Sequence, residues 1–413
     1  MVAMRRPSAS PTRSVWLPDG ASLCLPPLAG DLDADVVVVG GGLAGVCCAQ
    51  ALLERGVAAE RIVVLEARGI GGRASGRNAG FLLADLAESY ARLHGALGER
   101  ARRLRALSLR NQRTLIDWSA AAGVADAIEM TGVLVVAGSP HEEEELRASA
   151  ALLEADGFAV DWLDVADTAT RLAAPSAYGA LLDPAGGGCD PARLVQGLAR
   201  TLVAAGVRVY ERSPVEDLAC ASDGDAVAAC AGGAVRARLA VLATNAWAGG
   251  ADAFLDAAIR PVRAQMLSFP ARQRVLREVV YRNHGFEYFR QDAQGRFHFG
   301  GFRQTAAAEE TGDAEVLHAD VQERLLGYAR ALYPELDAVE PEHRWAGIMG
   351  FSQDGLPLVG AHPGRGSLLL CAGFTGHGLG LAAESARIVA GLAVDGRAED
   401  DDLFRPARLQ ELA

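Results

Sequence analysis

Three glycines spaced for phosphate binding are the first residues in this sequence whose pattern suggests chemistry. Gly40, Gly42 and Gly45 form a G-x-G-x-x-G motif, with Leu43 and Ala44 between the last two. The first glycine permits a tight turn, the second lets the backbone approach a pyrophosphate, and the third lets a helix pack closely against a strand. The N–H groups and the dipole at the start of that helix would attract phosphate. The motif therefore predicts a dinucleotide site.

The elements around this motif are those that a dinucleotide site needs. Residues 36–39 are four valines and are expected to form a buried parallel strand. A helix over residues 46–55 that stops at Gly56 should follow, and then a strand over 62–65 that ends at Glu66. Glu66 lies 21 residues after Gly45, which is the spacing of an acid that binds ribose hydroxyls and disfavours NADP. The alternative is a glycine-rich turn in an unrelated α/β unit.

A second glycine-rich stretch follows Glu66 directly, which is unusual for an NAD domain. Residues 66–81 read EARGIGGRASGRNAGF. This stretch resembles the D-amino-acid oxidase and glycine oxidase superfamily of FAD enzymes, and its S-G-R-N-x-G form is especially similar to the gamma-glutamylputrescine oxidoreductase group. In that superfamily the stretch runs beside the pyrophosphate towards the flavin ring. The resemblance implies FAD contacts from Ala67, Arg68, Gly72, Ala74, Ser75, Arg77, Asn78, Ala79 and Gly80.

Further blocks resemble the same superfamily and occur in its order. Residues 187–194 look like a helix start with Asp190 as N-cap and Pro191 in the first turn. Residues 241–247 look like the strand and turn that re-enter the FAD domain, 345–360 like its W-x-G to D-x-x-P-x-x-G block, and 368–378 like the last strand and the flavin-facing turn. The resemblance implies further FAD contacts within these blocks or next to them, from Ala243, Thr244, Trp247, Gly347, Gly373, Thr375, Gly376, His377, Gly378 and Leu379, and one outside them, from Val215.

Two of these residues, His377 at the last turn and Trp247 at the re-entry turn, have more specific expected roles. His377 could donate or accept a hydrogen bond at the flavin, or it could cap its own turn. Trp247 is expected to pack under the ring. The helix that follows, near residues 381–389, would direct its N-terminus at the flavin and stabilise the anionic reduced form.

The resemblance covers nearly the whole chain and implies an α/β fold. We expect a Rossmann-type, glutathione-reductase-like FAD-binding domain formed by residues 31–90, 180–250 and 345–395. An α+β substrate domain with a mixed or antiparallel sheet would comprise 91–179 and 251–344. Residues 1–30 would be an N-terminal extension and 396–413 an acidic, frayed tail. The acidic run 142–145 is expected to be the solvated face of a helix.

One departure from the family pattern bears on the substrate that this chain prefers. In glycine oxidase-like members, an arginine in the W-A-G-x-R block grips the substrate carboxylate, whereas this chain has Met349 there. We therefore expect an amine whose carboxylate is distant or absent. Arg344, Arg290 or Arg303 could take over the role of the missing arginine, and the alternative for each is a surface charge.

A second departure concerns reaction with oxygen. Monomeric sarcosine oxidase-like members place a lysine near the flavin on an x-K-x-G strand, and His298 holds the matching position here. A protonated His298 could stabilise forming superoxide, or it could be a structural strand histidine. The aromatic segment 281–290 could form a cage for an amine through His284, Phe286 and Tyr288, or it could be part of a packed sheet.

Composition bounds the partners and the compartment. The net charge of −12 argues against nucleic acid, because phosphate binding needs clustered Lys and Arg. Seven cysteines without C-x-x-C spacing fit neither a disulfide framework nor a zinc site, which predicts a reducing cytoplasm and no metal. The apolar window 36–53 is explained by the strand and helix of the glycine motif, so no membrane segment is expected.

We therefore expect an FAD-dependent oxidoreductase that oxidises the C–N bond of a small amine to an imine, with molecular oxygen giving hydrogen peroxide. Non-covalent FAD is expected, because residues 73–81 and 345–360 contain no His or Cys for a covalent link. One alternative is a D-amino-acid or glycine-type oxidase or dehydrogenase. Another is a non-catalytic flavin-binding subunit.

Overall fold

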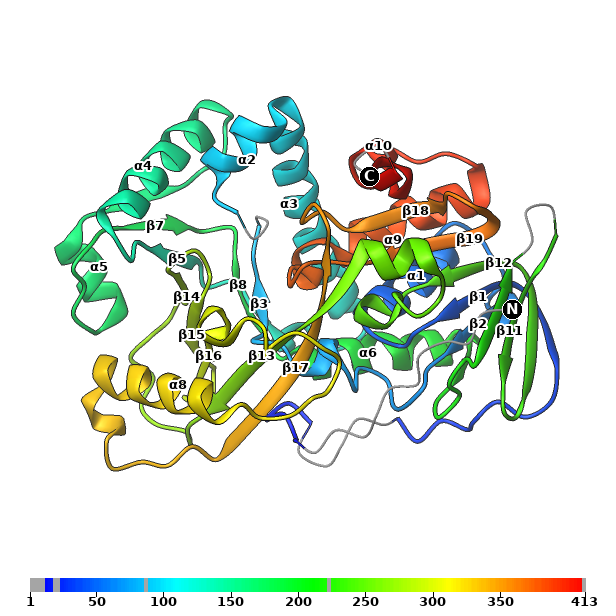
Figure 1. Ribbon diagram of the computed structural model, residues 1–413, viewed down its shortest axis with the longest axis horizontal. Coiled ribbons are helices and arrows are strands. Elements are labelled where there is room, and N and C mark those ends of the chain that lie inside the picture. Colours follow the sequence, from blue (N-terminus) through cyan, green and yellow to red (C-terminus); the bar gives the residue numbers. More distant parts are fainter. Residues whose placement is uncertain (1–11, 18–22, 85–87, 221–223, 411–413) are drawn as a thin grey trace.

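The computed structural model describes residues 12–17, 23–84, 88–220 and 224–410. Two large sheets lie side by side in it (Figure 1). A small third sheet has the strand order β3–β8–β4, formed by Phe81–Leu82, Gly187–Cys189 and Ile128–Glu129. Within the described residues, no helix is both long enough and apolar enough to cross a bilayer.

The first sheet contains the valine run, in strand β1, and the glycine motif follows this strand directly. Its parallel strands have the order β19–β12–β1–β2–β9, and β10, β11 and β18 add antiparallel pairs at its margins. The order β12–β1–β2–β9 is the parallel arrangement expected of a Rossmann-type domain. The strands are β1(Leu32–Val39), β2(Ile62–Leu65), β9(Arg208–Tyr210), β10(Asp217–Cys220), β11(Ala226–Cys230), β12(Gly233–Leu242), β18(Leu358–His362) and β19(Arg365–Ala372).

Four helices of 12 or more residues share one apolar core with this sheet, to which the short helix over residues 401–404 also contributes Leu403 and Phe404. The first of them begins at Leu43, directly after Gly42, which is three residues earlier than the sequence predicted. It ends at Glu54, and Gly56 adopts a φ of +87° just beyond, as expected of a glycine that stops a helix. The helices are α1(Leu43–Glu54), α3(Glu99–Ala121), α6(Pro191–Ala204) and α9(Gly378–Asp395).

The second sheet is mixed, with antiparallel pairs throughout except between β14 and β5. Helix α8(Ala319–Leu332) packs on one face against Phe289, Phe297 and Phe299. The opposite face looks towards the cavity described below. The strands, in sheet order, are β17(His343–Ser352), β13(Ile259–Ser268), β16(Phe297–Gly301), β15(Glu287–Gln291), β14(Val279–Arg282), β5(Val133–Val136), β7(Ala180–Asp183) and β6(Asp161–Leu163).

Some elements cross the domain boundaries that the sequence suggested. Strands β7 and β17 belong to the second sheet, although residues 180–250 and 345–395 were assigned to the FAD domain. The reason is pairing: β17 runs antiparallel to β13 along its whole length. Helix α3 was assigned to the substrate domain but packs in the core of the first sheet. The remaining helices are α2(Tyr90–Leu97), α4(Pro140–Ala155), α5(Val165–Leu172), α7(Ala253–Ala258) and α10(Asp401–Phe404).

Two expectations about charged segments are wrong. The acidic run at the start of α4 is not solvated throughout: Glu144 is exposed, but Glu142 is buried and accepts the backbone N–H groups of Gly138 and His284. Nor is the acidic end of the chain frayed up to residue 410. Phe404 of α10 is fully buried, and Asp400 forms ion pairs with Arg103 of α3.

Candidate functional site

The three motif glycines form a cradle in which no side chain would fit. Gly40 has a φ of +113°, and a Cβ there would lie 2.7 Å from the carbonyl oxygen of Ala243. A Cβ on Gly42 would lie 2.9 Å from Ser75 Oγ, and one on Gly45 would lie 1.9 Å from the carbonyl oxygen of Gly40. The backbone is thus bare where a pyrophosphate would approach, which is the function that the motif predicts.

One continuous cavity runs from this cradle towards the second sheet. Most of the residues expected to bind the cofactor line it. Their role as FAD ligands stays a prediction, but their convergence from distant segments fits a long dinucleotide. They are Gly40, Gly42, Leu43, Ala44, Glu66, Ala67, Ala74, Ser75, Arg77, Asn78, Ala79, Val215, Ala243, Thr244, Trp247, Gly347, Thr375, Gly376, His377, Gly378 and Leu379.

Five of the expected ligands stand behind this lining and support it. Gly45 packs against Gly40, and Gly80 and Gly373 hold positive φ angles at turns. Gly72 closes a turn by donating its N–H to the carbonyl of Gly69, and Arg68 extends to an acidic residue described below. Close packing and turn geometry explain the glycines at positions 45, 80 and 373.

The acid at the end of β2 lies at one end of the cavity. Glu66 accepts the N–H of Gly41 at 2.7 Å and the N–H of Arg68 at 2.8 Å. Burial raises the pKa of Glu66, and these two backbone donors partly offset that rise. Because a carboxylate has about four acceptor positions, two remain for ribose hydroxyls. The position of Glu66 therefore suits the ribose role.

The second glycine-rich stretch is fastened to the start of α1. Ser75 Oγ accepts the N–H of Leu43 at 2.8 Å. Asn78 closes the turn that follows, because its Nδ2 donates to the carbonyls of Ala74 and Ser75, each at 3.0 Å. Its Oδ1 accepts the N–H of Gly80 at 2.7 Å. These bonds hold residues 74–80 against the helix N-terminus, where phosphates bind best.

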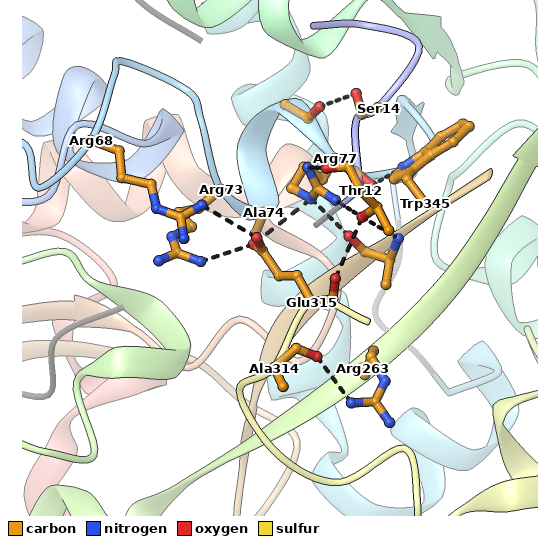
Figure 2. A network of polar contacts seen from close by, with 12 residues as sticks. Thr12, Ser14, Arg68, Arg73, Ala74, Arg77, Arg263, Ala314, Glu315 and Trp345 are labelled. Atoms are coloured by element: carbon orange, nitrogen blue, oxygen red, sulfur yellow. Dashed lines mark hydrogen bonds and ion pairs between the residues drawn. The ribbon is translucent and has the colours of Figure 1, made fainter. Parts of the chain in front are cut away.

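A buried acid that the sequence did not mark holds the arginines of this stretch (Figure 2). The carboxylate of Glu315 has only 1% of its side chain exposed. It lies 3.1 Å from Arg73 Nη1, 3.4 Å from Arg68 Nη1 and 3.7 Å from Arg77 Nε. Arg77 also donates to the carbonyl of Ala346 and to the carbonyl of Thr12. The cofactor segment, the second sheet and residues 12–17 therefore meet at one ionic cluster.

Residues 12–17 belong to the site. Ser14 Oγ donates to the carbonyl of Gly76, and Trp16 Nε1 donates to the carbonyl of Asn78 at 2.8 Å. Residues 1–30 were predicted only as an extension, so this role was missed. The signal was weak, because nothing in the sequence links residues 12–17 to residues 76–78.

The last turn before α9 is held by an asparagine. Asn245 Oδ1 accepts the N–H groups of Gly373 and Phe374 at 3.0 and 3.2 Å. His377 Nδ1 lies 3.0 Å from the carbonyl of Thr375, so this nitrogen carries the proton and caps the turn. Burial lowers the pKa of His377 and keeps the ring neutral. Its Nε2 is therefore an acceptor, and His377 lines the cavity, so both interpretations of this histidine are compatible with its position.

Three buried polar atoms of lining residues have no partner among the residues that the structure describes. They are Thr244 Oγ1, Trp247 Nε1 and His377 Nε2. Buried polar groups in proteins are almost always hydrogen-bonded. A polar ligand in the cavity would supply the missing partners, and FAD, with its ring and ribityl oxygens, fits that need.

The other end of the cavity is aromatic. Tyr281 and Tyr288 stack with their centroids 5.9 Å apart, and Phe81 lies against both at 5.7 and 6.0 Å. Burial raises the pKa of Tyr281 to about 12 and also raises that of Tyr288, so both phenols stay neutral. His284 and Met349 line this end too, whereas Phe286 lies just outside it. The aromatic segment thus forms both a packed sheet and a cavity wall.

His298 is not placed for the role in oxygen reactivity that the sequence suggested. Its side chain is fully buried, Nε2 lies 3.0 Å from Asp292 Oδ2, and the ring packs 4.6 Å from the ring of Trp16. It does not line the cavity. Burial lowers the pKa of His298 to about 4, so the ring is neutral at pH 7 and offers no cation to superoxide. The structure supports the alternative, a structural strand histidine.

The three arginines considered as substitutes for the missing carboxylate anchor differ. Arg290 is not a surface charge: it is buried, donates to the carbonyl of Cys189 and stacks on Trp16. Arg344 donates to Gln322 and lies away from the cavity. Arg303 does line the cavity. Other lining residues that the sequence did not single out are Arg73, Phe81, Leu83, Asn245, Ala264, Met266, Tyr281, Ile348, Phe351 and Phe374.

The chain is similar to known proteins along most of its length. The model of a family described as FAD dependent oxidoreductase matches residues 35–392. Glycine oxidase from Geobacillus kaustophilus (strain HTA426) is 29% identical over 365 residues, which are 87% of this chain and 92% of that protein. Gamma-glutamylputrescine oxidoreductase from Escherichia coli (strain K12) is 28% identical over 383 residues, which are 90% of this chain and 86% of that protein.

Solved structures show the same fold. L-proline dehydrogenase from P. horikoshii superposes with a TM-score of 0.79 at 19% identity, over 93% of this chain and 99% of that one. Glycine oxidase from Geobacillus kaustophilus superposes with a TM-score of 0.75 at 24% identity, over 91% and 99%. At these identities the likeness concerns the fold alone.

Proposed function

This chain belongs to the FAD dependent oxidoreductase family, and on that premise we propose that it oxidises the C–N bond of a small amine to an imine. Molecular oxygen would then be the electron acceptor. The observation that carries the proposal is the cavity that joins the glycine cradle to an aromatic pocket. A cofactor held at Gly42 could present its reactive end to a small molecule beside Tyr288.

The reaction balances as a two-electron oxidation. FAD, when bound, supplies the redox chemistry by accepting a hydride from the carbon next to nitrogen. Overall, the amine gives up two electrons and two protons, and dioxygen takes up both to become hydrogen peroxide. Water then splits the imine into a carbonyl compound and either ammonia, from a primary amine, or a smaller amine, from a secondary one.

The residues of the aromatic pocket favour a neutral amine. Tyr281, Tyr288 and Phe81 place apolar surface around the bound molecule, and desolvation disfavours the charged form of an amine. A neutral amine keeps the lone pair that the oxidation needs. His377 Nε2, an acceptor without a partner among the described residues, could accept an N–H of that amine. We propose that Tyr288 and His284 also contact the substrate, since both line the pocket.

We further propose that FAD is bound without a covalent link. No cysteine belongs to the described lining of the cavity. His377 has one nitrogen engaged with the carbonyl of Thr375. The cytoplasm, predicted from the cysteines, remains our proposal for the location.

The proposal is tested by anaerobic titration of the purified yellow protein with a library of small amines and amino acids. We expect at least one amine to bleach the flavin absorbance, and admission of air to restore it with one hydrogen peroxide per flavin. If only α-amino acids bleach the flavin, the glycine-type alternative holds instead. If nothing bleaches it, the proposed reaction is wrong.

Oxygen as the acceptor is tested in the same sample. Slow recovery of the yellow colour in air, together with fast recovery on addition of a quinone or dye, would identify a dehydrogenase. Fast recovery in air with stoichiometric peroxide is the expected result.

A further inference from the structure

Building on the proposed amine oxidation, we propose that Arg303 binds a carboxylate of the substrate, so that the substrate is an amine that also carries a carboxylate group. Arg303 begins a short 3-10 helix, Arg303–Ala306, directly after β16. Its side chain lines the aromatic end of the cavity together with Tyr288 and Met349. It is therefore a cation inside the proposed substrate pocket.

Aromatic rings hold this guanidinium in place. Its carbon lies 4.8 Å from the centroid of the Phe286 ring and 4.9 Å from that of the Phe351 ring. Both distances are within the range of cation–π contacts. Such contacts position a guanidinium but use none of its N–H groups, which stay available for an acceptor. Phe286 thus acts indirectly, through Arg303, although it does not line the cavity itself.

Arg303 lacks the acidic partner that Arg263 and Arg73 have. Among the described residues, no carboxylate lies within ion-pair distance of it, whereas Arg263 pairs with Glu310 at 2.9 Å and Arg73 with Glu315 at 3.1 Å. Burial lowers the pKa of Arg303, which means that removal of this cation from water carries a cost. A bound carboxylate would offset it and could accept two N–H groups at once.

The charges of the whole cavity favour an anionic group at this end. Glu66 is the one acidic side chain among the described residues that line the cavity, and it lies at the nucleotide end. A diamine or polyamine would bring a second ammonium group to the aromatic end and find Arg303 there instead of a carboxylate. Repulsion between like charges in a partly desolvated pocket selects against such molecules.

The place of Arg303 also explains why Met349 is tolerated. Met349 and Phe351 lie on β17, and residues two apart on a strand point to the same face. Because Arg303 packs on Phe351, its cation lies beside the strand position at which glycine oxidase-like relatives are expected to carry an arginine. The chain thus supplies a positive charge to the same pocket from a different element. Arg303 follows β16, and β16 pairs with β13 on the edge opposite to β17.

The test uses the FAD-loaded protein and two probes of equal size, butyrate and butyramide. Binding is followed by the change in flavin absorbance and by the shift in Tm. We expect butyrate to bind at least 10-fold more tightly than butyramide. Replacing Arg303 by Met should weaken butyrate binding about 10- to 100-fold and leave butyramide unchanged, as expected for loss of a charge-assisted hydrogen bond.

Two further variants control for folding and for charge. Arg303→Lys keeps the positive charge without the planar donor fork, so butyrate affinity should fall between the wild type and Arg303→Met. Arg260→Met removes a nearby exposed arginine of β13 that does not line the cavity, and it should change nothing. Unchanged butyrate affinity in Arg303→Met, or equal binding of both probes to the wild type, would overturn the proposal.

The outcomes separate this proposal from the proposed reaction. Bleaching of the wild-type flavin by amines, without any preference for butyrate over butyramide, would disprove the carboxylate site and leave amine oxidation standing. Arg303-dependent butyrate binding, without bleaching by any compound, would support the site and count against the reaction. A change in sulfite affinity of the flavin in Arg303→Met, without a change in butyrate affinity, would assign Arg303 to the flavin and overturn the carboxylate role.

Discussion

Replacing Glu315 by Gln should destabilise the protein, because three arginines share this one carboxylate. The side chains of Glu315 and Arg77 are 1% and 4% exposed, and those of Arg73 and Arg68 are 13% and 24% exposed. Burial lowers the pKa of Arg73 and of Arg77, and the charge of Glu315 counteracts this in both. Glutamine keeps the volume but removes the charge that compensates these cations.

The magnitude follows from the cost of leaving buried charges unpaired. Removing one partner of a buried ion pair costs about 3–5 kcal/mol. The contact with Arg68 adds less than about 1 kcal/mol because that side chain is partly solvated. With about 2.1 cal/mol/K of unfolding entropy per residue, the 413 residues give roughly 0.9 kcal/mol/K, so the expected decrease in Tm is about 3–6 °C.

The assay is differential scanning calorimetry of the FAD-loaded protein, with Glu309→Gln as the matched control. Glu309 belongs to the same loop region but is exposed. Retained FAD should be measured in parallel, because Arg73 and Arg77 flank residues 74–76, which are fastened to the start of α1 beside the cradle. A Tm of Glu315→Gln within about 1 °C of the control would refute the reasoning, since the arginines would then be solvated or paired elsewhere.

Three other outcomes are expected. Ser75→Ala should weaken FAD binding several-fold, because the N–H of Leu43 loses its acceptor. Titration of the apoprotein with FAD measures this affinity, and Ser75→Thr, which keeps a hydroxyl, should bind FAD nearly normally. His298 has a folded-state pKa of about 4, below its unfolded value of about 6.5. Its contribution to the free energy of unfolding is therefore complete above pH 6.5 and decreases as the pH falls towards 4. At pH 5 the free energy of unfolding should be lower by about 2 kcal/mol. His298→Gln should therefore reduce the fall in Tm between pH 7 and pH 5, and it should leave the rate of flavin reoxidation by oxygen unchanged in stopped flow; a slower rate would restore the oxygen role. Acid precipitation should leave all flavin in the supernatant, and colour in the washed pellet would disprove non-covalent binding.

Sequence alone predicted the parts of the site whose residues are neighbours along the chain. The cradle could be predicted because Gly40, Gly42 and Gly45 act through local backbone geometry, and any side chain there would collide with its neighbours. Strand β2 and the stop at Gly56 follow from equally local signals. The fold class was confirmed for the same reason, because these signals occur in a fixed order.

The errors concern residues whose surroundings come from distant segments. Because side chains alternate along a strand, His298 of β16 lies on the face opposite Phe297 and Phe299, which pack in the core. This alternation could not show that Trp16 covers that face and excludes a charged ring. Glu142 lies in a run of acids that is typical of a solvated helix, yet it accepts two backbone N–H groups. No sequence motif marks Glu315, because its three arginine partners lie more than 200 residues earlier in the chain.

The contact between Thr12 and Ala346 has a consequence for biosynthesis. The N–H of Ala346 lies 3.4 Å from Thr12 Oγ1 across a separation of 334 residues, and Arg77 donates to both residues. A nascent chain can close this junction only after β17 has left the ribosome. Contacts of such high sequence separation form late and slowly. Until then, Arg77 lacks the junction between β17 and residues 12–17 that holds it in place. We therefore expect a chain that emerges from the ribosome to capture its cofactor only near the end of its synthesis.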